Sequence, residues 1–339
     1  MNGKIRVAIV GCGGMGKVHS DCYAELKKNG ETIEVAAAVD IDSSKFTRIT
    51  DTHPEARTYG SLEQMLSADR VDIVHLTTPS YLHASMGMAC LQEGIHVFSE
   101  KPIALNLADA QCLCETAQES GRFLMIGQVL RFWQQYHYLK QIIQDKTWGA
   151  LRVLRLYRMG QAPAWDTRGW FLDPALSGRV PVDLHLHDVD FLNFLFGKPR
   201  TVQSRIVDDG RSLSSIHTVF DYPGLDARAE AAWVSAPIPF IFGYEATFDG
   251  ASVVMRDDVI QLYPTGGEAQ IVDAGAELRM DAGVNLSNMG PYLAEIAYFL
   301  QCVKINTAPT VVTPASAMTS LEIVLREVES ANLGSAVAM

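Results

Sequence analysis

The hydrophobic pattern of the first 126 residues alternates short apolar runs with longer helix-like stretches. The apolar runs are continuous, and they fall at residues 5–10, 34–39, 71–76, 95–98 and 123–126. A continuous run of this length is typical of a strand buried on both faces, as in a parallel sheet covered by helices. Two of the intervening stretches end on Gly94 and Gly121, a common way for a helix to end. The pattern therefore predicts an α/β fold with a doubly wound parallel sheet.

The pattern changes after about Gly127. A helix-like stretch at 133–144 is followed by strand-like runs at 151–157, 202–207, 216–222, 227–234, 240–248, 252–255 and 259–263. Their alternation and turn residues indicate a largely antiparallel sheet with one covered face. Further helix-like stretches lie at 182–196, 292–303 and 315–332. We therefore predict two domains, 1–126 and 127–339, the second an α+β domain. We expect the helix near 292–304 to pack back on the first domain.

Length and charge narrow the class of protein. A chain of 339 residues suits two cores better than one. Its net charge of −11 disfavours nucleic acid and anionic membrane as partners.

The six cysteines lack the spacing of a disulfide framework, which indicates a reducing compartment. No apolar run reaches the roughly 18 residues of a spanning helix, and the strand that starts near Lys4 leaves no room for a signal peptide. We expect a cytoplasmic protein.

A glycine-rich turn joins the first strand to the first helix. Gly11, Gly13 and Gly16 have the G-x-G-x-x-G spacing, and Gly14 and Met15 complete the turn. These glycines permit the tight turn, close approach of a pyrophosphate, and close packing of helix on strand. The helix N-terminus then favours an anion. The turn predicts a dinucleotide-binding Rossmann domain, with an empty, vestigial fold as the alternative.

Asp40 ends the second predicted strand. A carboxylate there can accept hydrogen bonds from the adenosine ribose and repels a 2′-phosphate, which favours NAD over NADP. The alternative is an ordinary solvated carboxylate at a strand end.

A second candidate segment, Glu100-Lys101-Pro102, follows a predicted strand. The carboxyl ends of parallel strands are where open α/β sheets bind ligands. Lys101 can point into such a site, with its backbone restricted by Pro102. The alternative is a solvated surface lysine.

The ordered set of motifs resembles the glucose–fructose oxidoreductase, inositol dehydrogenase and rhizopine-catabolism (Gfo/Idh/MocA) family. The matching pieces are GCGGMG at 11–16, Asp40, TTPSYLH at 77–83, EKP at 100–102, the segment 183–190, and the stretch 292–334. The resemblance implies cofactor contacts from Thr77, Thr78, Pro79, His83, Glu100 and Lys101, with a cis bond before Pro102. It also implies an open, mainly antiparallel second sheet whose outer face builds a homodimer or homotetramer.

The chain departs from this family pattern at two positions. Ser80 stands where family members often have asparagine, and Arg179 follows Gly178 where they often have two glycines. Arg179 could reshape a substrate pocket, so the substrate of a named member does not transfer to this chain.

Asp183 and His187 lie one helical turn apart, four residues along a predicted helix. A histidine suits removal of a hydroxyl proton near neutral pH. Asp183 can orient that histidine or bind a neighbouring hydroxyl. Lys101 can stabilise the developing alkoxide. These three residues are the predicted catalytic group.

Three alternatives remain open for Asp183 and His187. They can be a helix-capping carboxylate and a satisfied histidine. A metal site is conceivable in the crowded segment 183–190, although His185 and His187 face apart on a helix. His185 could also replace His187 as the acid/base.

The predicted substrate contacts are Arg131, Asp166, Trp170, Asp183 and His187, because position and resemblance favour them and such side chains grip ring hydroxyls and C–H faces. The sequence thus predicts an NAD(H)-dependent oxidoreductase that transfers hydride at a secondary alcohol of a sugar or cyclitol. The alternatives are a glycosidase-like enzyme that uses NAD as a transient oxidant, and a non-catalytic dinucleotide-binding regulator.

Overall fold

The computed structural model describes residues 4–163, 169–275 and 289–339, and it divides into two compact units. The first is Met1–Val129 with Glu277–Met318, and the second is Leu130–Ala276 with Thr319–Met339. The sequence pattern instead placed one boundary after residue 126. The later segment of the first unit includes α9 (Gly290–Lys304), the helix that the sequence analysis expected to pack back on the first domain, and α9 packs against α1 (Gly14–Lys28).

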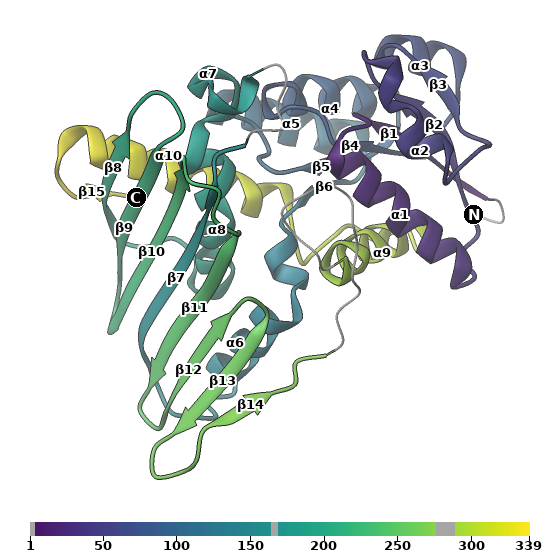
Figure 1. Cartoon of the computed structure of the whole chain (residues 1–339). Helices are drawn as coiled ribbons and strands as arrows, with labels where there is room; N and C mark the ends of the chain where they lie inside the picture. The colour runs from purple at the N-terminus through teal and green to yellow at the C-terminus, as the bar shows by residue number, and fades with distance from the viewer. Residues whose placement is uncertain (1–3, 164–168, 276–288) are drawn as a thin grey trace. The chain divides into compact units, whose positions relative to one another are not determined.

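The first unit contains a six-stranded parallel sheet (Figure 1). Its strands are β1 Ile5–Val10, β2 Ile33–Val39, β3 Arg57–Tyr59, β4 Ile73–Leu76, β5 His96–Glu100 and β6 Leu124–Gly127. The order β3-β2-β1-β4-β5-β6 reverses direction between β1 and β4, which is the switch point where doubly wound folds bind ligands. The predicted doubly wound sheet is confirmed. The pattern missed β3, whose residues are not buried.

Helices connect these strands: α1, α2 Thr47–Thr50, α3 Leu62–Ala68, α4 His83–Gln92 and α5 Leu107–Ser120. Local residues explain their limits. The Asn106 side chain accepts a hydrogen bond from the Asp109 N–H and caps α5. Gly121, with a φ of 64°, ends the same helix in the left-handed region. Within the described residues, no helix is long and apolar enough to cross a membrane.

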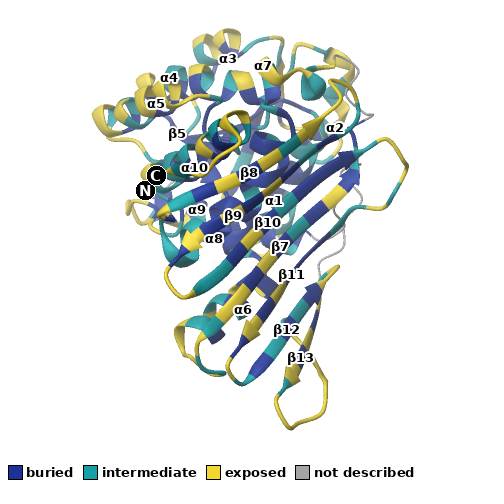
Figure 2. Cartoon of the chain, turned by 90° about the vertical axis from the view of Figure 1, so that its left-hand side faces the viewer, coloured by how far each residue is buried: buried dark blue, intermediate teal, exposed yellow. Residues whose placement is uncertain are grey.

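The second unit contains a nine-stranded sheet in the order β14-β13-β12-β11-β7-β10-β9-β8-β15. The strands are β7 Leu151–Gln161, β8 Thr201–Asp208, β9 Ser214–Tyr222, β10 Leu225–Val234, β11 Ile241–Phe248, β12 Ala251–Arg256, β13 Val259–Pro264, β14 Gln270–Val272 and β15 Val337–Ala338. Only the β7–β10 pair is parallel among these described strands. Buried and exposed residues alternate along them (Figure 2), which confirms a mainly antiparallel sheet with one covered face.

The predicted α-helix over 182–196 is wrong in its first part. A π-helical turn, η5 (Val180–His185), comes first, and α8 (Leu186–Phe196) follows it. A π-helical turn keeps residues four apart on nearly the same side. Val180 and Leu184 therefore both enter the core formed with Ile216, Ala231 and Trp233. The remaining helices of this part of the chain are α6 Gln134–Gln144, α7 Pro174–Ser177 and α10 Pro314–Leu333.

Two buried arginine–carboxylate pairs fix α8 in the second unit. Arg158 donates to both carboxylate oxygens of Asp188 at 2.6 Å. Arg131 donates to Asp190 at 2.8 and 2.7 Å, and Ser320 of α10 donates to the same carboxylate at 2.7 Å. Bidentate geometry of this kind gives specificity as well as energy. Both carboxylates thus serve to hold α8.

Removing one partner of the Arg158–Asp188 pair should destabilise the protein strongly. Asp188→Ala should cost about 3–5 kcal/mol, because it leaves a buried guanidinium without its counter-ion. Urea unfolding followed by circular dichroism measures this as a fall in midpoint. The double variant Arg158→Met with Asp188→Leu should recover much of the loss.

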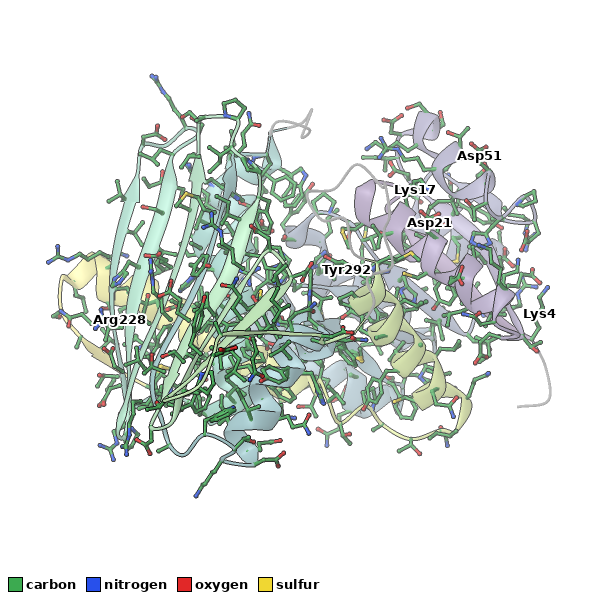
Figure 3. The ribbon with its side chains drawn as sticks, turned by 60° about the horizontal axis from the view of Figure 1, so that its bottom comes forward. Lys4, Lys17, Asp21, Asp51, Arg228 and Tyr292 are labelled. Carbon is green, nitrogen blue, oxygen red and sulfur yellow. The ribbon has the colours of Figure 1, made fainter. Side chains whose placement is uncertain are left out.

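The matched control is the exposed pair of Arg228 and Asp226 on β10 (Arg228 is labelled in Figure 3). Asp226→Ala should barely move the midpoint, since exposed ion pairs contribute little. If Asp188→Ala and Asp226→Ala lowered the urea midpoint equally, burial would not explain the contribution of the Arg158–Asp188 pair to stability.

Candidate active site

The glycine turn at the end of β1 is shaped by close backbone contacts. Gly11 has a φ of +98°, and a Cβ there would lie 2.6 Å from the carbonyl oxygen of Thr77. A Cβ on Gly16 would overlap the carbonyl oxygen of Gly11. A Cβ on Gly13 would meet nothing within 4 Å. Gly11 and Gly16 are therefore required by packing, whereas Gly13 borders open space, where a ligand can approach.

The start of α1 fits a pyrophosphate. No side chain caps this end of the helix, and its first turn, which contains Gly14 and Met15, has no acidic residue. Uncapped N–H groups and the helix dipole attract an anion at this point. The nearest charged residues along the helix, Lys17 and Asp21, pair with each other at 2.8 Å (Figure 3). The residues present thus fit the dinucleotide that the turn predicts.

Asp40 lies directly after β2 and supports the same turn. Its carboxylate accepts hydrogen bonds from the Cys12 N–H at 2.9 Å and from the Asp42 N–H at 2.8 Å. An ionised carboxylate has about four acceptor positions, so further positions remain for ribose hydroxyls. Asp40 therefore orders the glycine turn, and its role toward ribose stays a prediction.

The segment after β4 is tied to the turns around it. The Thr77 hydroxyl donates to the carbonyl of Gly11 at 2.6 Å. The ring nitrogens of His83 lie 2.8 Å from the carbonyl oxygens of Thr78 and Pro102. His83 thus holds the turn after β4 to the turn after β5. Pro79, in the turn after β4, is half-buried.

The hydroxyl of Thr78 is buried and has no hydrogen-bond partner among the described residues. The same is true of both amide atoms of Gln128, which directly follows β6 and is 1% exposed. Gln128 was missed in the sequence, and its only signal was a polar residue directly after an apolar strand. Orphaned polar groups at the carboxyl edge of a parallel sheet are suited to binding a polar ligand.

Glu100 is the last residue of β5, and Lys101 follows it with a cis bond to Pro102, as the resemblance implied. Lys101 is half-buried. Glu100 is buried and lies 3.0 Å from Nε2 of His19 on α1. The pair connects the end of β5 to α1.

His19 belongs to a buried hydrogen-bond chain that the sequence reasoning missed. Nδ1 of His19 lies 2.8 Å from Nδ1 of His75, and Nε2 of His75 lies 2.6 Å from the Tyr23 hydroxyl. The contacts are all satisfied when Tyr23 donates to His75, His75 donates to His19, and His19 donates to Glu100. Burial lowers the pKa of His75 well below its ordinary value, in keeping with a neutral ring.

Glu295 of α9 lies in the same part of the first unit. It is fully buried, and neither carboxyl oxygen has a hydrogen-bond partner among the described residues. Burial raises the pKa of Glu295 well above its ordinary value, and the Glu100 carboxylate raises it further. The environment of Glu295 therefore favours its protonated form. A glutamate inside the apolar helix at 292–303 was the available signal.

In the second unit, Asp183 and His187 differ from their neighbours in exposure. Between residues 179 and 192, these two are half-buried and every other residue is buried. Asp183 lies in η5, and His187 lies in the first turn of α8. The structure therefore leaves both residues partly exposed in an otherwise buried segment.

The neighbours of Asp183 and His187 are engaged within the second unit. His185 is fully buried, and its Nε2 lies 3.1 Å from Glu327. Asp188 and Asp190 form the arginine pairs described above. The described residues include no group of three side chains placed to hold a metal ion. His185 is thus a weaker acid/base candidate than His187.

The other predicted substrate contacts have different outcomes. Arg131 is buried, and its guanidinium pairs with Asp190, which gives it a structural role in this unit. Trp170 is half-buried and stacks on Phe171 with ring centroids 3.8 Å apart. Asp166 lies outside the described residues. Substrate contact stays a prediction for all three.

The fold and the glycine turn define a two-unit protein with a dinucleotide-binding Rossmann domain. The family model "Oxidoreductase family, NAD-binding Rossmann fold" matches residues 5–128, and the "GFO/IDH/MocA C-terminal domain" matches residues 136–247. The chain belongs to the Gfo/Idh/MocA family, and the predicted family and nicotinamide cofactor are confirmed.

Similar proteins include myo-inositol 2-dehydrogenase of Thermotoga maritima, 26% identical over 57% of this chain and 55% of the relative. D-glucoside 3-dehydrogenase of Escherichia coli is 28% identical over 58% of this chain and 55% of the relative. The chain thus spans about half the length of these curated relatives. A solved levoglucosan dehydrogenase, in complex with NADH and levoglucosan, has a TM-score of 0.85 at 17% identity, with 99% of both chains covered. That likeness shows the fold.

Removing the charge of Asp40 should relax the choice between NAD and NADP. Asp40→Asn keeps one acceptor oxygen for the turn but no longer repels a 2′-phosphate. The dissociation constant for NADPH divided by that for NADH should fall by about tenfold or more, because a loss of about 1.4 kcal/mol of repulsion is enough for this change. Fluorescence titration with NADH and NADPH measures the ratio.

Asp51→Asn is the control, because Asp51 is an exposed carboxylate at the end of α2 in the same unit. It should leave the ratio unchanged. An unchanged ratio for Asp40→Asn as well would remove Asp40 from cofactor discrimination.

The raised pKa of Glu295 predicts a pH-dependent stability. The folded state keeps the Glu295 proton above pH 4.5, where the unfolded state loses it, so this group makes the wild type less stable as pH rises. Glu295→Gln has no such proton to lose. The melting temperature of the variant, minus that of the wild type, should therefore increase from pH 5 toward pH 8, as measured by differential scanning fluorimetry.

Glu119→Gln on the exposed face of α5 is the control and should give a difference that does not depend on pH. A flat difference for Glu295→Gln would mean that Glu295 is ionised in the folded protein.

Proposed function

We propose that the protein is an NAD(H)-dependent dehydrogenase that oxidises a secondary alcohol of a sugar or cyclitol, or reduces the matching ketone. The family supplies the oxidoreductase class and the NAD-binding domain. The names of the relatives, an inositol dehydrogenase and a glucoside dehydrogenase, support a polyhydroxylated ring as the substrate class.

The observation that carries the proposal is the exposure of Asp183 and His187. In a segment where every other residue from 179 to 192 is buried, an aspartate and a histidine stay partly exposed. Accessible side chains that can exchange protons, on an otherwise buried segment, are suited to a substrate rather than to a core. The alternative of a satisfied core histidine fits His185 better, because its ring lies against Glu327.

Each residue has a distinct role in the proposed reaction. His187 accepts the hydroxyl proton of the substrate as the carbinol carbon loses hydride. Asp183 orients the imidazole or binds a neighbouring hydroxyl, and either role lowers the entropy cost of a productive pose. The Lys101 ammonium stabilises the negative charge that develops on the substrate oxygen.

The cofactor residues described above complete the proposal. Bound NAD supplies the hydride acceptor. The uncapped start of α1 and the open side of Gly13 receive its pyrophosphate, and Asp40 binds the adenosine ribose. Thr78 and Gln128 offer buried polar groups at the carboxyl edge of the sheet.

A homodimer or homotetramer is part of the same proposal, supported by exposed apolar side chains such as Val153, Met159 and Val219 on the uncovered sheet face.

The test is a screen with NAD and a panel of inositols, aldoses and glucosides, followed by NADH absorbance. On the best substrate, His187→Ala should lower kcat by about 10²–10⁴-fold. Lys101→Met should also lower kcat, while the dissociation constant for NADH stays near that of the wild type. The controls are His137→Ala and Lys28→Met, because both positions are exposed.

The outcomes separate the competing functions. Net NADH formation that requires Lys101 and His187 supports the dehydrogenase. Glycoside turnover without net NADH formation would indicate the glycosidase-like reaction instead. Tight NADH binding with no turnover on any substrate would indicate a dinucleotide-binding regulator.

A further inference from the structure

Arg179 has a backbone conformation that side chains rarely adopt. Its φ is 51° and its ψ is −151°, a region that is essentially restricted to glycine. Gly178 before it has a φ of +69°, and a Cβ there would overlap the side chain of Val182. The chain therefore makes a left-handed turn of two residues directly before η5. Only the second position, Arg179, carries a side chain and the strain that comes with it.

The side chain of Arg179 compensates for this strain with buried contacts. The residue is 5% exposed. Its Nη1 lies 2.9 Å from Asp208, and its Nη2 donates to the carbonyl oxygen of Arg211 at 2.7 Å. Asp208 is the last residue of β8, and Arg211 lies in the connection from β8 to β9. The Arg179 N–H also donates to Ser177 Oγ at 2.9 Å. Arg179 thus joins the turn before η5 to the β8–β9 hairpin.

Asp183 lies between two such attachments of η5. Arg179, directly before the turn, is attached to the β8–β9 hairpin. His185, at the end of the turn, lies 3.1 Å from Glu327 of α10. Between them, Val180 and Leu184 pack into the core beside Ile216. A single π-helical turn has little stability of its own and depends on such contacts. The direction of the Asp183 side chain therefore depends on both attachments.

We propose that Arg179 is a positioning residue: its clamp on the β8–β9 hairpin fixes the π-helical turn that carries Asp183. A purely structural turn would favour glycine, which adopts this conformation without strain. Arginine at this position therefore indicates that its contacts with the β8–β9 hairpin have a role that glycine could not fill. The inference rests on the proposed function insofar as Asp183 contacts the substrate.

The first measurement needs no substrate. Hydrogen exchange of the full-length protein, read by mass spectrometry, reports the opening of residues 180–186. Arg179→Gly should speed their exchange by about tenfold or more. Asp208→Asn removes the hairpin end of the clamp without changing the backbone at position 179, and it should have a similar effect. The double variant should add little to Arg179→Gly, because that change already removes the contact with Asp208.

Lys146→Gly is the matched control. Lys146 is also a cationic residue with a φ of 51°, but it is exposed at the end of α6. Lys146→Gly also places glycine at a position of positive φ and should leave exchange at 180–186 unchanged. Arg179→Lys keeps the charge and should protect this segment partly.

The second measurement separates positioning from a structural role. On the best substrate of the screen, Arg179→Gly should lower kcat by about 10- to 100-fold. The melting temperature and the NADH dissociation constant should stay near the wild type, since relief of backbone strain offsets the lost contacts. Arg179→Lys should restore part of kcat.

Wild-type exchange at 180–186 in Arg179→Gly, or a wild-type kcat, would overturn the proposal. So would an effect of Arg179→Gly that Asp208→Asn does not share. A screen that finds no substrate would defeat the proposed function, and the exchange result would still decide whether the clamp exists.

Discussion

The first unit depends on the close approach of two backbone turns, those that follow β1 and β4. The Gly11 position lies so near the Thr77 carbonyl that any Cβ would have to displace it. The Thr77 hydroxyl bonds back to Gly11, and Gly16 of α1 rests on the same peptide. Since these turns meet where the strand order reverses, this contact fixes the start of α1 at the switch point. The helix end is then left without a side-chain cap, which is what an anionic ligand needs.

The two units treat their buried polar groups in different ways. In the second unit, Asp188, Asp190 and His185 each have a partner that holds a helix in place. In the first unit, a chain of hydrogen bonds runs from Tyr23 to Glu100, and burial favours the protonated form of Glu295 by raising its pKa. Burial without a partner is costly, so each of these groups is either paired or neutral. Crowding of charged residues in a sequence is therefore a poor guide to function until these internal pairs are known.

Much of the fold could be predicted because it depends on local patterns. Continuous apolar runs identified the parallel strands, and the glycine spacing identified the dinucleotide turn. The short strand β3 escaped because it is not buried, and η5 escaped because α-helical and π-helical turns have similar apolar spacing. The ion pairs of Arg131 and Arg158 were not predictable, since their partners lie at least 30 residues away. For the same reason the sequence could propose the motifs of the candidate site but not the distant contacts that hold them.

The turn at Gly178 and Arg179 shows how a local rule fails at a position under other demands. Backbone conformation alone would select glycine twice, and the chain selects it only once. Strain is retained in folded proteins where surrounding contacts determine it, and Arg179 makes those contacts to Asp208 and Arg211. Glycine would have given an easy turn with freedom to move, whereas arginine gives a strained turn attached to the hairpin. The segment that follows carries the partly exposed Asp183, so freedom of movement is lost where the proposed reaction would need a fixed geometry.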